Sequence, residues 1–470
     1  MMDEPLDTIH KALALNLDNS KYGSFAEIGA GQEVARWFFQ AGKAAGTVAK
    51  SVSAYDMQVS DGIYGPTQRY VSRERLESML EHEYKDLVGR LDAKRGENTN
   101  FFVFADTVAT HKRTPTETGH GWLGIRFQVH PRKEPSEIII HVKMLDQDPL
   151  GQQAGLGMFG VNLIYAAFHS WWDPTALLKS LADGLKRERG EVDMIKFSGP
   201  AFEEVDNRLM SLQLVELGLT DAAMFTAKGE VVQSGEVLYH KPVLIERGSF
   251  RPITNVTLEM LDRTLEQVRG DNPGDSENCV VLMEMTLNNL MCEKSIDHKD
   301  FLARADILNA LGKNVLISNY TRFDGVTDYL RQYTKSKIGM VVGVPTLVEI
   351  FREEYYQDLE GGILEGLGRL FSGPVTLYVY PTIGATGELL TAENPAIKPE
   401  LKHLYEYLWD NRYIAMIREY DKAGLTVSPA DVLAKLQSGD SAWESMVPAR
   451  AAQLIKEKNF FGYPRTTAAD

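Results

Sequence analysis

The sequence predicts a mixed α/β protein, in which a strand-rich middle region is followed by a parallel βαβ unit and a helical C-terminal tail. The main sign is a series of short apolar runs, separated by amphipathic segments, at 280–285, 315–318, 338–342 and 375–380. Parallel strands read as unbroken apolar runs because helices cover both faces of their sheet. Strand patterns also dominate the middle of the chain, and helical patterns dominate its last part.

Residues 1–95 are predicted to form a helical N-terminal region. Residues 1–20 have the pattern of a short amphipathic helix. Residues 72–91 have the pattern of a longer one, in which Ser72 is a typical N-cap and charged side chains share one face. Turn-forming dipeptides occupy 55–67, so the two helices are joined by a linker.

Two glycines in this region have two interpretations. Gly29 and Gly31 follow a short apolar run and precede a helical pattern that starts at Glu33. This is the outline of a dinucleotide-binding fingerprint, whose glycines let the backbone approach a pyrophosphate. The third glycine position is occupied by Val34, so the alternative is that small residues let helices pack closely.

Residues 96–270 are predicted to form a mixed α+β domain. Two strand-like segments, 121–129 and 137–144, are joined by a proline-containing turn, which indicates a hairpin. A helix is expected over 153–169. The strand-like segments of this domain are 101–105, 121–129, 137–144, 194–197, 222–226 and 242–246.

Residues 271–390 are predicted to form the parallel α/β domain, and residues 391–470 the helical tail. A run of turn-forming residues at 271–277 marks the boundary before the first parallel strand. The amphipathic segments 300–311 and 323–333 are long enough to be the crossover helices that parallel strands require.

The composition limits the class of protein. A net charge of −15, from 65 acidic and 50 basic residues, disfavours nonspecific nucleic-acid binding because no basic excess displaces counterions. The first residues lack the pattern of a signal peptide, and no apolar run approaches the length of a membrane span. The two cysteines indicate no disulfide framework. We therefore expect a cytoplasmic protein without a nucleic-acid or membrane partner, and the sequence identifies no cofactor.

Polar residues follow the apolar runs, where ligands collect in open α/β sheets. The second run leads into Ser318, Asn319, Thr321 and Arg322, which we predict to bind an anion or a nucleotide; a solvated loop is the alternative. Glu284 is an acid within a predicted buried strand. It is therefore either a structural acid with a partner or a tuned acid–base group, and it is a candidate catalytic residue.

Two further clusters are candidates for binding. Arg247 and Arg251 flank a glycine-containing loop, which suits either bidentate capture of an anion or a salt-bridge loop between domains. Lys112 and His120 belong to a polar stretch that either faces a phosphate or is a solvated loop, and His120 is a second candidate catalytic residue. No two residues of this stretch have the helical spacing of metal ligands, so no metal site is predicted.

Around 23–36 and 238–252 the chain resembles a family of uncharacterised bacterial proteins of similar length, and the likeness covers most of the chain. Proteins of this family carry the labels nicotinate-nucleotide adenylyltransferase and TonB-dependent receptor. The first label implies nucleotide transfer, and Ile317-Ser-Asn-Tyr-Thr-Arg322 is similar to the segment with which such enzymes hold ATP phosphates. The paired histidines of those enzymes have no counterpart, nor does the export signal that the receptor label implies.

These observations lead to two hypotheses of function. In the first, the protein binds a phosphorylated or nucleotide-like small molecule at the strand ends within 279–382, and acts on it as an enzyme. In the second, it is a non-catalytic, self-assembling scaffold, because no catalytic motif is intact and the small residues near the N-terminus could pack between subunits. A homo-oligomer is expected in either case.

Overall fold

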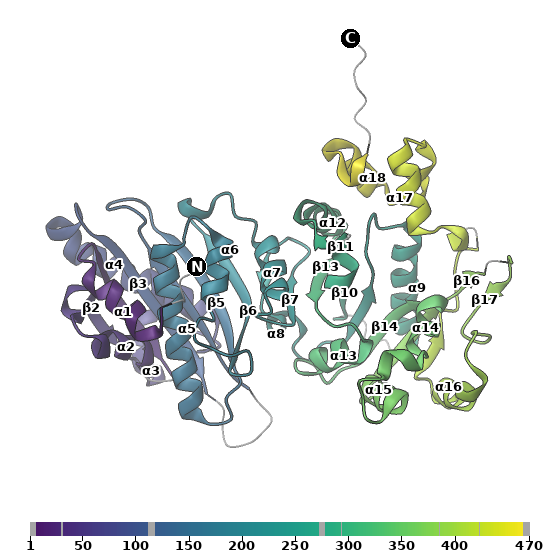
Figure 1. Ribbon diagram of the computed structural model, residues 1–470, viewed down its shortest axis with the longest axis horizontal. Coiled ribbons are helices and arrows are strands. Elements are labelled where there is room, and N and C mark those ends of the chain that lie inside the picture. The colour runs from purple at the N-terminus through teal and green to yellow at the C-terminus, as the bar shows by residue number, and fades with distance from the viewer. Residues whose placement is uncertain are drawn as a thin grey trace, which may run out of the picture. The chain divides into compact units, whose positions relative to one another are not determined.

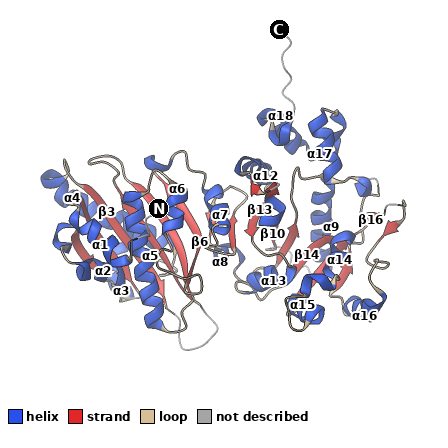
Figure 2. Ribbon diagram, in the orientation of Figure 1, coloured by secondary structure: helices blue, strands red, loops and turns tan. Residues whose placement is uncertain are grey.

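The computed structural model describes residues 6–29, 32–110, 118–271, 278–292, 294–384, 386–422 and 424–463. Contacts divide the chain into two units, Met1–Asp221 and Ala222–Asp470 (Figure 1). Each unit contains one large β-sheet and several helices (Figure 2). The mixed α/β class predicted from the sequence is therefore confirmed. In the described part of the chain, no helix combines the length and apolar character needed to cross a membrane.

The sheet of the first unit has six strands, in the order β2-β1-β3-β4-β5-β6. Strand β1 pairs in parallel with β2 and β3, and β3 to β6 form an antiparallel meander. The strands are β1 (Lys21–Ile28), β2 (Val48–Val52), β3 (Asn100–Ala109), β4 (Gly119–Phe127), β5 (Ser136–Met144) and β6 (Gly190–Ser198).

The N-terminal region, predicted to be helical, contains the helices expected at 1–20 and 72–91 but also two strands. It contains β1 and β2, and β1 is longer than the apolar run that marks it, because the strand begins with Lys21-Tyr22-Gly23-Ser24. Gly23 and Ser24 are buried although neither is an apolar residue of the kind that signals a strand. Burial of small and polar residues beside β3 is a tertiary effect that the local pattern does not contain.

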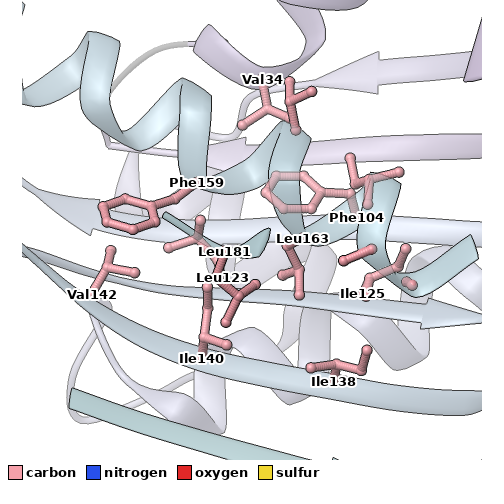
Figure 3. Packing of buried hydrophobic residues seen from close by; sticks show 14 of the residues in the cluster. Val34, Phe104, Leu123, Ile125, Ile138, Ile140, Val142, Phe159, Leu163 and Leu181 are labelled. Atoms are coloured by element: carbon pink, nitrogen blue, oxygen red, sulfur yellow. The ribbon is translucent and has the colours of Figure 1, made fainter. Parts of the chain in front are cut away.

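Helices cover both faces of this sheet. Buried side chains of α1, α2, α5, α6 and α7 share one apolar cluster with alternate residues of the strands. Figure 3 shows Phe159 and Leu163 of α5 above Leu123, Ile140 and Val142 of the sheet. Leu76 and Leu80 of α4 pack on the other face, where Gly124 has no side chain to obstruct them. The helices are α1 (Thr8–Leu17), α2 (Glu33–Ala41), α3 (Met57–Tyr64), α4 (Arg73–Arg95), α5 (Pro149–His169), α6 (Pro174–Ser180) and α7 (Asn207–Glu216), with 3₁₀ turns η1 (Ala44–Gly46) and η2 (Pro200–Phe202).

Small residues let the helices of this unit approach one another closely. A Cβ atom on Gly160 of α5 would overlap the Val34 side chain of α2, and one on Gly157 would lie 2.9 Å from Trp37 Nε1. Ala35 of α2 is fully buried in the same cluster. Ala35, one of the small residues of the N-terminal stretch, therefore serves packing inside this unit.

Gly29 is required by the backbone at the end of β1. Its φ is +104°, and a Cβ atom there would overlap the Val108 carbonyl oxygen of β3. Close approach of two strand backbones therefore explains this glycine, whereas the sequence had suggested either phosphate binding or close packing of helices. Gly31 lies outside the described residues.

We expect Gly29→Ala to lower the free energy of unfolding by roughly 2 kcal/mol or more, because alanine is strained at this φ and collides with β3. Thermal unfolding followed by circular dichroism measures the change. Gly62→Ala is the matched control: Gly62 lies in α3 with open space around it, so alanine should be neutral or slightly stabilising there. Equal midpoints for the two variants would contradict this account of Gly29.

The sheet of the second unit has eight strands, in the order β18-β15-β14-β9-β10-β13-β7-β8. The four apolar runs of the sequence are β10, β13, β14 and β15, and all are parallel, as predicted. The strands are β7 (Ala222–Phe225), β8 (Val231–Val232), β9 (Val243–Arg247), β10 (Val280–Thr286), β13 (Asn314–Ser318), β14 (Ile338–Gly343), β15 (Val375–Tyr380) and β18 (Ile414–Met416). Two small hairpins are β11 (Met291–Cys292) with β12 (Ser295–Ile296), and β16 (Thr382–Ile383) with β17 (Leu389–Leu390).

Six of these strands form a doubly wound parallel sheet. Numbered along the chain from β9, they lie in the order 3-2-1-4-5-6, and antiparallel β7 extends the edge beside β13. The chain thus builds outward from β9 to β10 and β13, then returns to the other side of β9 with β14. This reversal is the topological switch point, where other open α/β sheets bind their ligands.

Helices cover this sheet in the way that the strand order requires. Side chains of α13 to α16 share an apolar cluster with Val243, Ile245 and Met340, whereas α9 and α12 contact the strands outside that cluster. The larger helices are α9 (Asn255–Asp271), α12 (His298–Ala310), α13 (Phe323–Arg331), α14 (Val344–Ile350), α15 (Gly362–Leu370), α16 (Lys402–Asp410), α17 (Pro429–Ser438) and α18 (Ala449–Lys458). The short ones are α8 (Ser234–Leu238), α11 (Leu287–Leu290), η3 (Glu353–Tyr356), η4 (Pro399–Leu401), η5 (Gly424–Thr426), η6 (Ser441–Met446) and η7 (Phe460–Gly462).

The contacts give two units where the sequence analysis expected four segments. Strands from both sides of residue 95 pair with each other, as β1 does with β3. The same holds across residue 270 for β9 and β10, and across residue 390 for β15 and β18. Parallel pairing joins strands that are separated by a helix and its loops, so a turn-rich stretch between them is a crossover connection and no domain boundary.

Candidate functional site

The carboxyl ends of β9, β10 and β13 bring three of the predicted site residues together. Glu284 of β10 is fully buried between Arg247 of β9 and Ser318 of β13. Arg247 Nε lies 2.9 Å from Glu284 Oε2, and Arg247 Nη2 lies 3.0 Å from Oε1. Ser318 Oγ donates to the same Oε1 at 2.6 Å. The result is a bidentate ion pair with a hydroxyl donor, which satisfies a buried carboxylate.

Arg247 also holds the segment that follows β13. Its Nη1 donates to the Thr321 carbonyl oxygen at 3.1 Å, and its Nη2 to the Arg322 carbonyl oxygen at 3.4 Å. The guanidinium lies over the Phe323 ring, 4.3 Å from the ring centroid. The segment 318–322 is therefore attached to the tips of β9 and β10, at the carboxyl edge of the sheet.

Glu284 is engaged through both carboxylate oxygens, so this geometry gives it the role of positioning Arg247. That agrees with the structural interpretation of a buried acid in a strand. An acid–base role would require an oxygen that is left for a substrate, and Arg247 and Ser318 occupy both.

The remaining residues after β13 differ in how they are engaged. Arg322 Nε donates to Asp324 at 3.0 Å, and its Nη1 pairs with Asp358 at 2.7 Å. Its Nη2 makes no hydrogen bond to another described residue. The side chains of Asn319 and Thr321 are exposed, and neither has a hydrogen-bond partner in the described part of the chain. This edge thus offers hydroxyl, amide and guanidinium groups to a ligand.

Arg251 belongs to a separate cluster. Its Nε lies 2.6 Å from Asp300 Oδ1, and Asp300 Oδ2 accepts from the buried Arg304 at 2.6 Å. Arg304 in turn donates to the Ser249 carbonyl oxygen. Arg247 and Arg251 therefore do not converge on one anion, contrary to one interpretation of their spacing. Each guanidinium has its own carboxylate, because a buried or half-buried cation is stable only with a partner.

Several charged residues of this region were not identified from the sequence. Asp300, Arg304 and Asp358 become important only because the fold brings them to Arg251 and Arg322. Glu246, the residue before Arg247, is buried, and burial raises its pKa well above the usual value. Glu246, like Glu284, is an acid within an apolar strand, and this pattern could have identified it from the sequence.

His120 belongs to the first unit, whereas the edge described above belongs to the second. His120 is the second residue of β4, where its Nδ1 lies 3.1 Å from His141 Nε2. Lys112 lies outside the described residues. Over the ranges that the structure describes, no group of three or more His, Cys, Asp or Glu side chains is arranged to hold a metal ion.

Comparisons with known proteins give little. No family model and no curated protein matches the sequence. The chain is similar to the competence/damage inducible protein CihA from Agrobacterium tumefaciens at 14% identity and a TM-score of 0.27, over 35% of this chain and 98% of that one. It is also similar to the competence damage-inducible protein A from Klebsiella pneumoniae at 12% identity and a TM-score of 0.27, over 35% of this chain and 99% of that one. A third similar structure is a competence-damaged protein superfamily member from Enterobacter cloacae, with 13% identity and a TM-score of 0.26, over 36% of this chain and 95% of that one. No argument rests on likeness at these TM-scores.

Proposed function

We propose that the second unit binds a phosphorylated, nucleotide-like small molecule at the carboxyl edge of its sheet, beside the switch point between β9 and β14. The observation that supports this most is the strand order 3-2-1-4-5-6, with Arg247 at the end of its first strand. In sheets of this order the loops on the two sides of the switch point diverge and leave room for a ligand.

The groups at this edge suit such a ligand. Arg322 Nη2, Thr321 and Asn319 supply donors that no other described residue uses, and an oxyanion accepts hydrogen bonds from all three kinds of group. Four of the five N–H groups of Arg247 already donate within the protein. Arg247 therefore orders the segment after β13, and Arg322 is the cation that meets the anion. The similarity of 317–322 to a segment that holds ATP phosphates supports the same assignment.

A thermal-shift panel of nucleotides, dinucleotides and sugar phosphates tests the proposal. A ligand at 100 times its dissociation constant stabilises the native state by about 2.7 kcal/mol, which is a readily measured shift. Arg322→Gln should remove most of the shift, because it removes the cation and leaves Asp324 and Asp358 without it.

Arg412→Gln is the matched control. The substitution removes the same charge from an exposed turn that precedes β18, the outermost strand on the side of the sheet away from β13. The variant should therefore keep the full thermal shift. No shift with any member of the panel would refute the proposal. A full shift in Arg322→Gln would refute the assignment of the ligand to this edge.

A further inference from the structure

A row of three polar side chains crosses β4, β5 and β6 in the first unit. His120 Nδ1 lies 3.1 Å from His141 Nε2, and His141 Nδ1 lies 2.5 Å from Asp193 Oδ1. His141 pairs with Met194 and Val142 with Val192, so Asp193 is an extra residue in a β-bulge. Bulges of this kind redirect a side chain and are common beside active sites. The bulge here gives Asp193 its position beside the imidazole.

The inner part of the row is held rigidly. His141 and Asp193 are 2% and 4% exposed. The Trp122 ring meets the His141 ring edge to face, with centroids 4.8 Å apart. Lys143 Nζ lies 3.6 Å from Asp193 Oδ2, and a cation at this distance favours the ionised carboxylate.

The hydrogen bonds determine which nitrogens carry protons. A carboxylate accepts, so His141 Nδ1 carries the proton that it donates to Asp193. In this arrangement the lone pair of the His141 ring is on Nε2, which accepts the Nδ1 proton of His120. His120 is left with a lone pair on Nε2. Among the described residues, none forms a hydrogen bond with that atom, and the ring is half-buried.

Burial lowers the pKa of His120 to about 4. The ring is therefore neutral at pH 7 and its Nε2 is free to accept a proton. A purely structural histidine would use both nitrogens within the fold, whereas here the outer nitrogen of the row is left unused.

We propose that His120, His141 and Asp193 form an acid–base site in the first unit, with His120 as its catalytic residue and the other two as positioning residues. His120 Nε2 takes a proton from a water molecule or from the hydroxyl group of a small polar substrate. The Nδ1 proton of His120 moves to His141 Nε2 in the same event. The electron pair of the broken O–H bond stays on the oxygen, and the positive charge resides on His141, beside the Asp193 carboxylate.

NMR of ¹⁵N-histidine-labelled full-length protein at pH 7 reads the tautomers directly. His120→Gln and His141→Gln identify the signals. We expect both rings to carry their proton on Nδ1 and none on Nε2. A wild-type His120 ring that is protonated on Nε2 would overturn the proposal.

Acylation by diethyl pyrocarbonate, followed by mass spectrometry of each histidine, tests the role of Asp193. The reagent attacks unprotonated imidazole nitrogen, so wild-type His120 should react. Asp193→Asn no longer fixes the His141 tautomer and should slow the reaction at His120 by about tenfold or more. His130, exposed in the turn after β4, is the internal control and should react at an unchanged rate. Equal rates at His120 in both proteins would overturn the positioning role.

Discussion

Glu284→Ala is expected to lower the free energy of unfolding by about 3–5 kcal/mol, because it leaves a buried guanidinium without its carboxylate. Arg247 is 11% exposed and Glu284 is not exposed at all, so water cannot replace the lost partner. Ser318 loses its acceptor in the same change. Urea unfolding at pH 7, with the midpoint and slope both recorded, measures the effect.

The double variant Arg247→Met/Glu284→Leu separates the unpaired charge from the lost packing. Replacing a whole buried ion pair by apolar side chains of similar volume is often neutral. We therefore expect the double variant to be more stable than Glu284→Ala alone. If Glu284→Ala differed from the wild type by less than about 1 kcal/mol, the ion pair would not be what holds the edge together.

The second large effect concerns a pair of buried acids in the first unit. Glu27 of β1 and Asp106 of β3 are register partners and are both fully buried. Glu27 accepts hydrogen bonds from the amides of Val34 and Ala35, at 2.8 and 3.1 Å, and so caps α2. Burial raises the pKa of Glu27 to about 7. Burial and the Glu27 carboxyl raise the pKa of Asp106 well above its usual value.

A raised pKa in the native state means that the folded protein binds protons that the unfolded chain has already released. The stability that this pair contributes is therefore complete only below the ordinary pKa values of the two carboxyl groups, 4.5 and 3.8, and it falls as the pH rises toward 7 and beyond. Asp106→Asn removes one acid and gives Glu27 an amide donor. We expect it to be more stable than the wild type by roughly 2–4 kcal/mol at pH 8, and about equal to it at pH 5.

Thermal unfolding of both proteins from pH 5 to pH 8 checks this expectation. Other titrating groups are common to the two proteins and cancel in the difference. Glu204→Gln, exposed in the turn after η2, is the control for a general loss of negative charge and should leave the pH dependence unchanged. A constant difference between Asp106→Asn and the wild type across this range would contradict the account of the pair.

The sequence predicted β3 to β6 of the first sheet and the four parallel strands of the second, but it did not predict the full length of β1 or the presence of β2. Residues 338–342, and residues 280–285 apart from Glu284, are apolar because helices cover both sides of their strands, so the pattern itself carries the burial. β1 begins with Lys21-Tyr22-Gly23-Ser24, and its burial depends on pairing with β3, more than seventy positions later in the chain. No local pattern reports such a partner.

The candidate site was likewise predictable from the sequence only in part. The position of Ser318 to Arg322 just after a strand was enough to place them at the carboxyl edge. The acids that neutralise the arginines could not be anticipated, since Asp358 is 36 positions from Arg322 and Asp300 is 49 from Arg251. His141 and Asp193, which give His120 its chemistry, are 52 positions apart. The fold determines which charged side chains pair, and their spacing along the chain does not predict the pairing.

Apolar patterning alone, then, determined the class of fold, the four buried parallel strands and the edge at which polar loops emerge. The reason is that the free energy of burial depends on which residues are apolar and on their spacing, and the local sequence contains both. Only the tertiary structure decided the 3-2-1-4-5-6 order, the ion pairs of the arginines and the histidine–aspartate row. Strand order and charge pairing are properties of residues that meet across the sheet, and their energies depend on distances that the linear chain does not specify.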